Sequence, residues 1–467
     1  MPTNDRIIVG VDVGTHKICT IVAEAEPAGM LNVLGVGAVA SEGVSKGLIT
    51  DIVKASGAIA HSLEAAERQS GCRILSAYVS ISGQHVSSFN SRGLVSVSPS
   101  DHVIVAGDVE RAIDQAKAVA MPAGREILHV IPRTYTIDGQ EGIRNPVGLS
   151  GWRLDVETHL VTGASNVREN LVRCVQQADV EVDDTVLSAL AGAEAALTEQ
   201  EKNLGVVYID VGHGTTDIAI YVEGSVWHTK SLPIGGWHLS NDLSIVFNIP
   251  YEAAEALKLQ YGRAVVPGSK AHAVPVGQTV NGKSHPQGGV GVGIASEGGY
   301  ANGRRERLDG GLIDGGTDDE MLETRNFNDE PKQIGRGELN EVMAARLDQL
   351  FGMIQDEIRR SGYEGLLPGG VVMTGGVAAM PGLEQSARAR LKMPVRTGRP
   401  KRIGGLAEGF DGPAYATSVG LVLWGLRQLA HPQPGSGRAV GSTGRERSIG
   451  EPANVLAKWL KRFLPGG

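Results

Sequence analysis

Cysteine is scarce in this 467-residue sequence, which has only Cys19, Cys72 and Cys174. Three scattered cysteines fit neither a metal-ligand spacing nor a disulfide framework. We therefore expect a reducing compartment, the cytoplasm, and no disulfide.

Long apolar runs are also missing. No run reaches the ~18 residues of a transmembrane helix, and the polar first residues lack the apolar core of a signal peptide.

The formal net charge is −8, which argues against nucleic acid as a main partner. Neither GxxxxGKS/T nor GxGxxG opens a helix after an early strand, so Walker and Rossmann nucleotide sites are excluded as well.

A glycine- and threonine-containing motif is present twice. Residues 8–17 read IVGVDVGTHK and residues 207–217 read VYIDVGHGTTD, and an apolar run follows each of them. Each copy predicts a strand, a tight glycine turn and a second strand. Glycines bring backbone N–H groups close to phosphate oxygens, and threonine hydroxyls add hydrogen bonds. Two copies predict related subdomains that close on one nucleotide; the alternative is a pair of ordinary hairpins in a duplicated domain.

The positions within these motifs suggest individual roles. Asp12 and Asp210 stand at strand ends, where they can order a hydrated Mg²⁺ or, alternatively, cap the turns. Asp217 is the candidate for contacting an attacking water. Thr15 and Thr216 could instead be mere strand formers. The candidate phosphate contacts are Gly14, Thr15, Lys17, Gly212, Gly214, Thr215 and Thr216.

A third segment, residues 370–383, predicts a buried strand, a glycine turn and a helix. Gly375 and Gly376 would let the backbone lie flat against an adenosine. Gly236 opens an expected helix, and Glu255 and Lys258 share a helix face from which they would reach the ribose and base. Lys258 could equally be a surface charge.

These three motifs, in this order, resemble the superfamily of actin, DnaK-type chaperones and sugar kinases. The resemblance implies an α/β, actin-like (ribonuclease H-like duplicated) two-domain fold with an inserted small α+β subdomain. Its ligands would be ATP and Mg²⁺. The first domain is expected to comprise residues 1–82 and 163–197, with the insertion at 83–162. The second domain is expected to have its core at 198–236 and 337–400 and an outer lobe at 237–336, which includes a glycine-rich excursion at about 264–335. A closing segment at 401–430, whose helix packs on the first domain, should be followed by a flexible linker at 431–453 and an amphipathic helix at 454–467.

The tail after the linker has its apolar residues on one helical face and its cations on the other side or its flanks. A short, basic, tryptophan-containing helix on a flexible leash suits an anionic membrane surface, whereas the alternative is a helix packed on its own domain. One copy would bind weakly, so the tail predicts oligomerisation. The candidate membrane residues are Leu456, Lys458, Trp459, Leu460, Lys461, Arg462, Phe463 and Leu464.

Further strings narrow the resemblance. Residues 128–132 read LHVIP, residues 140–151 read QEGIRNPVGLSG, and residues 228–230 read HTK. With these the chain closely resembles the FtsA family of bacterial cell-division proteins, from Ile7 to about Leu429 plus the tail.

The resemblance implies an ATP-binding protein of the divisome that polymerises on the cytoplasmic face of the inner membrane at the septum. It would anchor FtsZ filaments through the tail and help to recruit later division proteins. The insertion would serve filament contacts and recruitment. The C-terminal peptide of FtsZ would bind around Glu341 and Arg346, although Arg346 could be a solvated charge.

The sequence departs from the pattern of the family and its active relatives at two places. The glycine-rich excursion is longer than usual. Ala189 stands where active relatives carry a water-activating Glu or Gln, and Glu194 follows more than a turn later. Without that base, ATP hydrolysis should be slow or negligible. The alternatives are a pilus-assembly scaffold of the same fold, or an enzyme of the sugar-kinase, acetate-kinase or polyphosphate-hydrolase type.

Overall fold

The computed structural model describes residues 6–26, 29–97, 101–264, 318–401 and 403–430. The predicted linker 431–453, the predicted membrane helix 454–467 and residues 265–317 of the glycine-rich excursion lie outside the described residues. Among the residues described, no helix combines the length and apolar character needed to cross a membrane.

The first half is built on a five-stranded sheet of order β11-β6-β1-β2-β3. β1 pairs antiparallel with β2 and parallel with β6. Helix α1 packs on β2 and β3, and α3 packs on α1. Asp51 caps α1, and Gly71 ends it at φ +67°. The bounds are β1 (Ile7–Val13), β2 (Lys17–Ala25), β3 (Leu31–Ala40), α1 (Ile52–Ser70), β6 (Ser76–Ile81), α3 (Ser165–Gln176) and β11 (Glu181–Leu187); the short strands β4 (Val44–Ser45) and β5 (Leu48–Ile49) pair with each other.

The second half repeats this sheet with the order β14-β13-β12-β17-β18. β12 again pairs antiparallel with the next strand and parallel with a later one. The strands are β12 (Val206–Val211), β13 (Thr216–Val222), β14 (Ser225–Leu232), β17 (Val371–Thr374) and β18 (Val395–Thr397). The matching order and strand directions confirm the predicted duplication.

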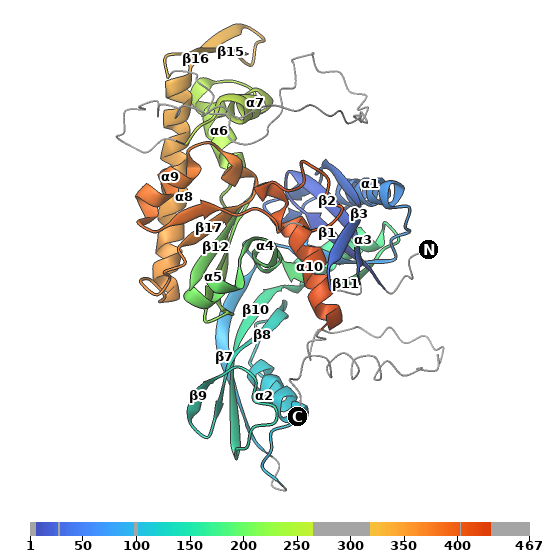
Figure 1. Cartoon of the computed structure of the whole chain (residues 1–467). Coiled ribbons are helices and arrows are strands. Elements are labelled where there is room, and N and C mark those ends of the chain that lie inside the picture. Colours follow the sequence, from blue (N-terminus) through green and yellow to red (C-terminus); the bar gives the residue numbers. More distant parts are fainter. Residues whose placement is uncertain (1–5, 27–28, 98–100, 265–317, 402, 431–467) are drawn as a thin grey trace, which may run out of the picture. The chain divides into compact units, whose positions relative to one another are not determined.

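Two small-residue helices, α4 (Ser188–Ala196) and α10 (Ala416–Ala430), pack on each other. α10 also packs on β1 and β2, and α4 packs on β12 and β13, so the pair joins the two halves. The contact is close because both helices present glycine or alanine. A Cβ added to Gly420 would lie 1.8 Å from the carbonyl oxygen of Ala191. Figure 1 shows α10 beside the first sheet, with α4 next to it.

The insertion is a four-stranded antiparallel sheet of order β7-β10-β8-β9. Helix α2 packs on β7 and β10, where Gly93 allows close approach: a Cβ there would lie 1.9 Å from the carbonyl oxygen of Ala112. The elements are β7 (Ser87–Ser96), α2 (Ala106–Lys117), β8 (Arg125–Ile137), β9 (Gln140–Ile143) and β10 (Arg153–Ala164). Their α+β character agrees with the expectation from the sequence.

The outer lobe of the second half contains α6, α7 and a hairpin of β15 and β16, which belongs to the expected excursion, and α8 packs on α6. α8 buries Leu339, Met343, Leu347, Leu350 and Ile354, and this spacing of three or four residues keeps one face on the core. The elements are α6 (Gly236–Phe247), α7 (Tyr251–Tyr261), β15 (Met321–Arg325), β16 (Pro331–Gly335) and α8 (Arg336–Ser361), with α5 (Glu199–Leu204), η2 (Gly376–Ala379), α9 (Leu383–Leu391) and η3 (Pro413–Tyr415) elsewhere in the chain.

His129 of β8 connects the insertion to the first half. Its Nε2 accepts a hydrogen bond from the backbone N–H of Leu187 at 3.0 Å, and its ring meets Trp424 edge-on. Burial lowers the pKa of His129 from 6.5 to about 4. The acceptor role requires a neutral imidazole, so acid should break this contact.

We expect acid to destabilise the protein through His129. The unfolded chain takes up the proton near pH 6.5, whereas the folded chain does so only near pH 4. The free energy of unfolding should therefore fall by about 2 kcal/mol between pH 7.5 and pH 5 from this residue. His129→Gln keeps an acceptor but does not titrate, so urea unfolding of this variant should depend less steeply on pH. His61→Gln, at an exposed position of α1, is the control; equal slopes in all three proteins would contradict the assignment.

Candidate functional site

The two predicted turns have the same form. In the first, the N–H of Gly14 donates to the carbonyl of Lys17 at 3.1 Å; in the second, the N–H of Gly212 donates to the carbonyl of Thr215 at 2.9 Å. Each turn joins the first two strands of its sheet. The two turns also meet, since a Cβ added to Gly214 would lie 2.7 Å from the Thr15 hydroxyl oxygen. The structure thus places two equivalent glycine turns face to face.

Beneath the turns, α10 links the two predicted Mg²⁺ residues. Thr417 donates its hydroxyl to Asp210 at 2.8 Å, and Ser418 donates to Asp12 at 2.9 Å. Asp12 also accepts from Ser80 at 2.9 Å. Neighbouring residues of one helix therefore bind the equivalent aspartates of both halves, which ties the spacing of the halves to the position of α10.

The surroundings of these two carboxyl groups disfavour their charged forms. Burial, followed by the nearby charge of Asp217, raises the pKa of Asp210 to about 7. Burial also raises the pKa of Asp12, against the lowering effect of Lys17. Oδ1 of Asp210 accepts no hydrogen bond from the described residues. Concentrated carboxylate oxygens with spare acceptor capacity fit a hydrated divalent cation.

Lys17 lies among these acidic groups without facing the opposite turn. Its ammonium donates to the carbonyl of Ala414 at 2.6 Å and lies 3.2 Å from the ring centroid of Tyr415. Burial lowers the pKa of Lys17. A contact with phosphate, as predicted from the sequence, requires the ammonium to leave these partners.

Three threonines of the motifs have different surroundings. Thr15 accepts the N–H of Gly47 at 3.4 Å, and Thr215 lies 3.2 Å from the hydroxyl of Ser82. Thr216 is fully buried, and its hydroxyl donates to the carbonyl of Ile234 at 2.8 Å. The Thr216 side chain therefore secures the strand end, as in the alternative weighed from the sequence, because that hydroxyl is already committed within the protein.

Asp217 lies opposite Asp210 in the strand register. Its carboxylate is buried and accepts the Ser82 hydroxyl at 2.8 and 2.6 Å and the Thr215 hydroxyl at 3.3 Å. These bonds give it a structural role at the edge of the insertion. Its contact with an attacking water stays a prediction.

The residues predicted to contact the ribose and base of the nucleotide converge on the start of α6. Lys258 donates to Glu255 at 2.8 Å and to the carbonyl of Gly236 at 3.2 Å. The N–H of Gly236 donates to the carbonyl of Gly212 at 2.9 Å, so this group adjoins the second turn. Lys258 is buried, which makes the surface-charge alternative wrong.

The third segment also reaches the second turn. Gly375 has φ +87°, and a Cβ there would lie 2.3 Å from the carbonyl oxygen of Val211 and 2.4 Å from Oδ1 of Asp210. A Cβ on Gly376 would meet no atom of the described residues within 4 Å. The first glycine is thus required by packing, and the second borders open space.

Comparisons with known proteins give the family of the chain. Two family models match: "Cell division protein FtsA" over residues 207–420, and "SHS2 domain inserted in FTSA" over residues 83–162. Cell division protein FtsA of Pseudomonas aeruginosa is 36% identical over 461 residues, 99% of this chain and 98% of that protein. The FtsA of Escherichia coli K12 is 32% identical over 467 residues, 98% and 99% of the two chains.

The chain belongs to the FtsA family. It is therefore a cell-division protein of actin-like fold, which confirms the family and the fold predicted from the sequence. Among solved structures, the PilM–PilN type IV pilus biogenesis complex aligns with a TM-score of 0.58 at 12% identity, over 90% of this chain and 98% of that chain. That similarity shows the shared fold and gives no support to a pilus function.

The residues predicted to dock FtsZ lie on α8. Arg346 donates to both carboxylate oxygens of Asp242 on α6, each at 2.6 Å. Glu341 is exposed. Ile245 and Val246 of α6 are 70% and 58% exposed, which leaves apolar surface on the helix that bears Asp242. Arg346 is thus part of a fixed ion pair and is not a freely solvated charge; its contact with FtsZ stays a prediction.

The residue that the sequence analysis placed at the position of the water-activating base can be located in the structure. Ala189 is buried on α4. Glu194 accepts from Lys202 at 3.0 Å and from Arg427 at 2.7 Å. Burial raises the pKa of Glu194, but these two cations more than offset it, so the pKa is lowered overall. Glu194 is therefore an ion-pair partner and is poorly suited to accept a proton from water.

Sequence reasoning missed several site residues of this FtsA-family chain. Thr417 and Ser418 hold the two aspartates, and Tyr251 donates to Glu255 at 3.3 Å. Thr417 and Ser418 are adjacent hydroxyl residues at the start of a largely apolar helix, and this pattern could have indicated their role. His16 and His213 at the turn tips were within the quoted motifs, but no role was given to them.

Proposed function

We propose that this chain binds ATP with Mg²⁺ between its two turns and, in that form, assembles into filaments on the inner membrane. The filaments would anchor FtsZ and help to recruit later division proteins. The observation that supports this most is the link from Thr417 and Ser418 to Asp210 and Asp12. A ligand that binds both aspartates would fix the two halves relative to each other, because both aspartates are also hydrogen-bonded to α10.

Within this site, backbone N–H groups of the two turns would bind the phosphates, as glycine turns commonly do. Bound Mg²⁺ would neutralise phosphate charge, and Asp12 and Asp210 would hold it through water. Glu255, Lys258 and the Gly375–Gly376 turn would take the ribose and base. Since Ala189 offers no base and Glu194 is paired, ATP would act chiefly as a structural ligand, with slow or negligible hydrolysis.

The membrane contact would come from the tail. Burial of one large apolar side chain contributes about 1.5–3 kcal/mol, and each cation near an anionic surface about 1 kcal/mol. Folding a short helix on the surface offsets part of this gain. Assembly of several copies would therefore be needed for firm binding.

The test is sedimentation with anionic liposomes, with and without ATP and Mg²⁺. We expect the full chain to pellet most strongly with ATP, and a chain ending at His431 to stay in the supernatant. Trp459→Glu in the full chain should weaken pelleting similarly, which controls for loss of the linker. If ATP has no effect, or if the shortened chain pellets equally, the proposal is wrong.

The Arg346–Asp242 pair gives a separate prediction for FtsZ. Arg346→Glu should weaken binding of the FtsZ C-terminal peptide at least about tenfold, the equivalent of 1.4 kcal/mol. Repulsion from Asp242 would reshape the surface between α6 and α8, and the peptide would lose a cation. Fluorescence anisotropy of a labelled peptide measures this.

The matched control is Arg359→Glu on the same helix. Arg359 pairs with Glu364 at 3.3 Å, and thirteen residues place it about 20 Å from Arg346. It should leave peptide affinity unchanged. Equal losses in both variants would point to general charge effects and against a docking site at Arg346.

A further inference from the structure

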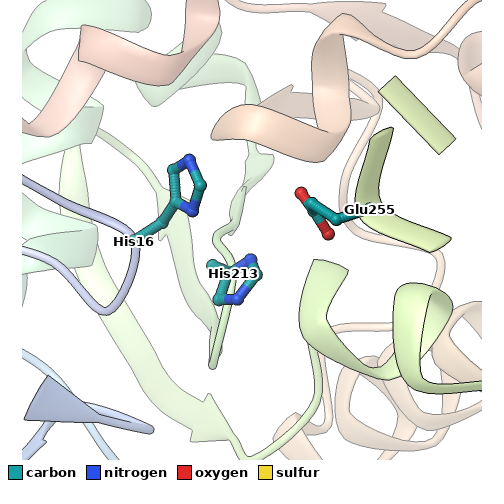
Figure 2. Close-up of side chains that lie close together, drawn as sticks. All are labelled: His16, His213 and Glu255. Atoms are coloured by element: carbon teal, nitrogen blue, oxygen red, sulfur yellow. The ribbon is translucent and has the colours of Figure 1, made fainter. Parts of the chain in front are cut away.

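Three side chains converge at the turns, and only Glu255 among them has a role in the proposed function. His16 is at the tip of the first turn, His213 is at the tip of the second, and Glu255 comes from α7. One ligand atom of each lies within 4.8 Å of those of the other two. The two imidazole rings have centroids 5.0 Å apart (Figure 2).

Each of the three has a free lone pair among the described residues. Neither ring nitrogen of His16 has a hydrogen-bond partner there. His213 uses Nε2 toward the Tyr251 hydroxyl at 3.2 Å and leaves Nδ1. Glu255 takes Ser240, Tyr251 and Lys258 on Oε2, so Oε1 remains available.

The three donor groups are of the kinds that bind transition metals. Two imidazoles and one carboxylate each bring a ligand atom to this point. Imidazole nitrogen and carboxylate oxygen are both ligands of Zn²⁺ and related ions.

We propose that His16, His213 and Glu255 form a binding site for a transition-metal dication of the Zn²⁺ type. The site is distinct from the Asp12 and Asp210 pair, whose oxygen ligands suit Mg²⁺. Because its ligands come from both turns, the metal would hold the two halves together at this point. The carboxylate is already oriented by Ser240, Tyr251 and Lys258, as metal-binding carboxylates usually are by surrounding hydrogen bonds.

Formation of the site requires a small movement. Metal–ligand bonds of about 2.0–2.1 Å in tetrahedral geometry place ligand atoms about 3.4 Å apart, so the side chains must approach by about 1.4 Å at most. His16 is exposed and makes no side-chain hydrogen bond to the residues that the structure describes, so its side chain can make this approach. A fourth position would stay open to water or another ligand.

The test uses the full-length, nucleotide-free protein after chelator treatment. Titration with Co²⁺ should give the visible absorption of a low-coordinate site at one ion per chain, and Zn²⁺ should displace it. His16→Gln and His213→Gln should each weaken Co²⁺ binding by at least about tenfold. His61→Gln, which removes an exposed histidine of α1, should bind as the unchanged protein does.

Urea unfolding of His16→Gln without metal establishes that this exposed substitution leaves the fold intact. Absence of the Co²⁺ absorption, or equal affinity in His16→Gln, would overturn the proposal. So would weaker ATP binding in His16→Gln with unchanged Co²⁺ binding, since the histidine would then serve the nucleotide. Because the titration contains no nucleotide, failure of ATP binding leaves this result independent of the proposed function.

Discussion

Gly420→Ala is expected to destabilise the protein by about 3 kcal/mol or more, because it places a methyl group where α10 touches α4. The added Cβ would lie 1.8 Å from the carbonyl oxygen and 2.3 Å from the carbonyl carbon of Ala191. Both atoms belong to a helix backbone, which cannot rotate away as a side chain can. The helices must therefore separate, and the cores that include Val419, Leu421 and Val422 lose packing.

The same substitution should also affect the site. Thr417 and Ser418 lie within one turn of Gly420, and they hold Asp210 and Asp12. Displacement of α10 should lengthen these hydrogen bonds and weaken ATP binding. Urea unfolding and nucleotide titration measure the two effects on the same preparation.

Gly57→Ala is the matched control for this experiment. Gly57 is also inside a helix, α1, but a Cβ there would lie more than 4 Å from every atom in the described part of the chain. Alanine should stabilise that helix by about 0.5–1 kcal/mol. If Gly420→Ala were as stable as the unchanged protein, the close contact of α4 and α10 would be refuted.

The second large effect is expected at Asp210, where Asp210→Asn should stabilise the nucleotide-free protein. The folded pKa of Asp210, about 7, lies above the ordinary 3.8, so the folded chain keeps a proton that the unfolded chain releases. Asp210 therefore does not lower the free energy of unfolding below about pH 3.8, and it lowers that free energy progressively as the pH rises to about 7. The loss reaches about 4 kcal/mol at pH 8 as an upper limit, because the residue is partly open to solvent.

Asparagine removes this loss while its amide oxygen still accepts from Thr417. The free energy of unfolding of the variant should therefore exceed that of the unchanged protein most at pH 8 and least at pH 5. At the same time Mg²⁺ should no longer strengthen ATP binding, because an amide is a poorer partner for the hydrated ion. Urea unfolding at both pH values, and ATP titration with and without Mg²⁺, provide the measurements.

A stabilised variant that loses the response to Mg²⁺ would identify Asp210 as a residue kept for binding at the expense of stability. Ser80→Ala, which removes one hydrogen bond to Asp12 but no charge, is the comparison. It should lower the free energy of unfolding, because the N–H of Val13 also loses its acceptor, and it should not stabilise the protein at pH 8. If Asp210→Asn were less stable than the unchanged protein at pH 8, burial of an unfavourable charge at this position would be ruled out.

The sequence by itself determined the elements with local causes. Alternating or continuous runs of branched apolar residues around Gly14 and Gly212 required two strand–turn–strand units, because glycine is the residue that permits such turns. The repeat of that unit, with aspartates at matching places, was enough to predict the duplicated fold. Helix α8 was equally predictable, since its apolar residues recur every three or four positions.

Only the tertiary structure decided which of these residues meet. Nothing local in the sequence says that Thr417 and Ser418 reach aspartates about 200 and 400 residues away, because such pairing depends on how α10 packs between distant strands. Lys17 was expected at phosphate but lies on Tyr415, since burial favours the nearest carbonyl and aromatic ring. The approach of His16, His213 and Glu255 has the same origin: each residue is fixed by its own turn or helix, and the packing of the two halves brings them together.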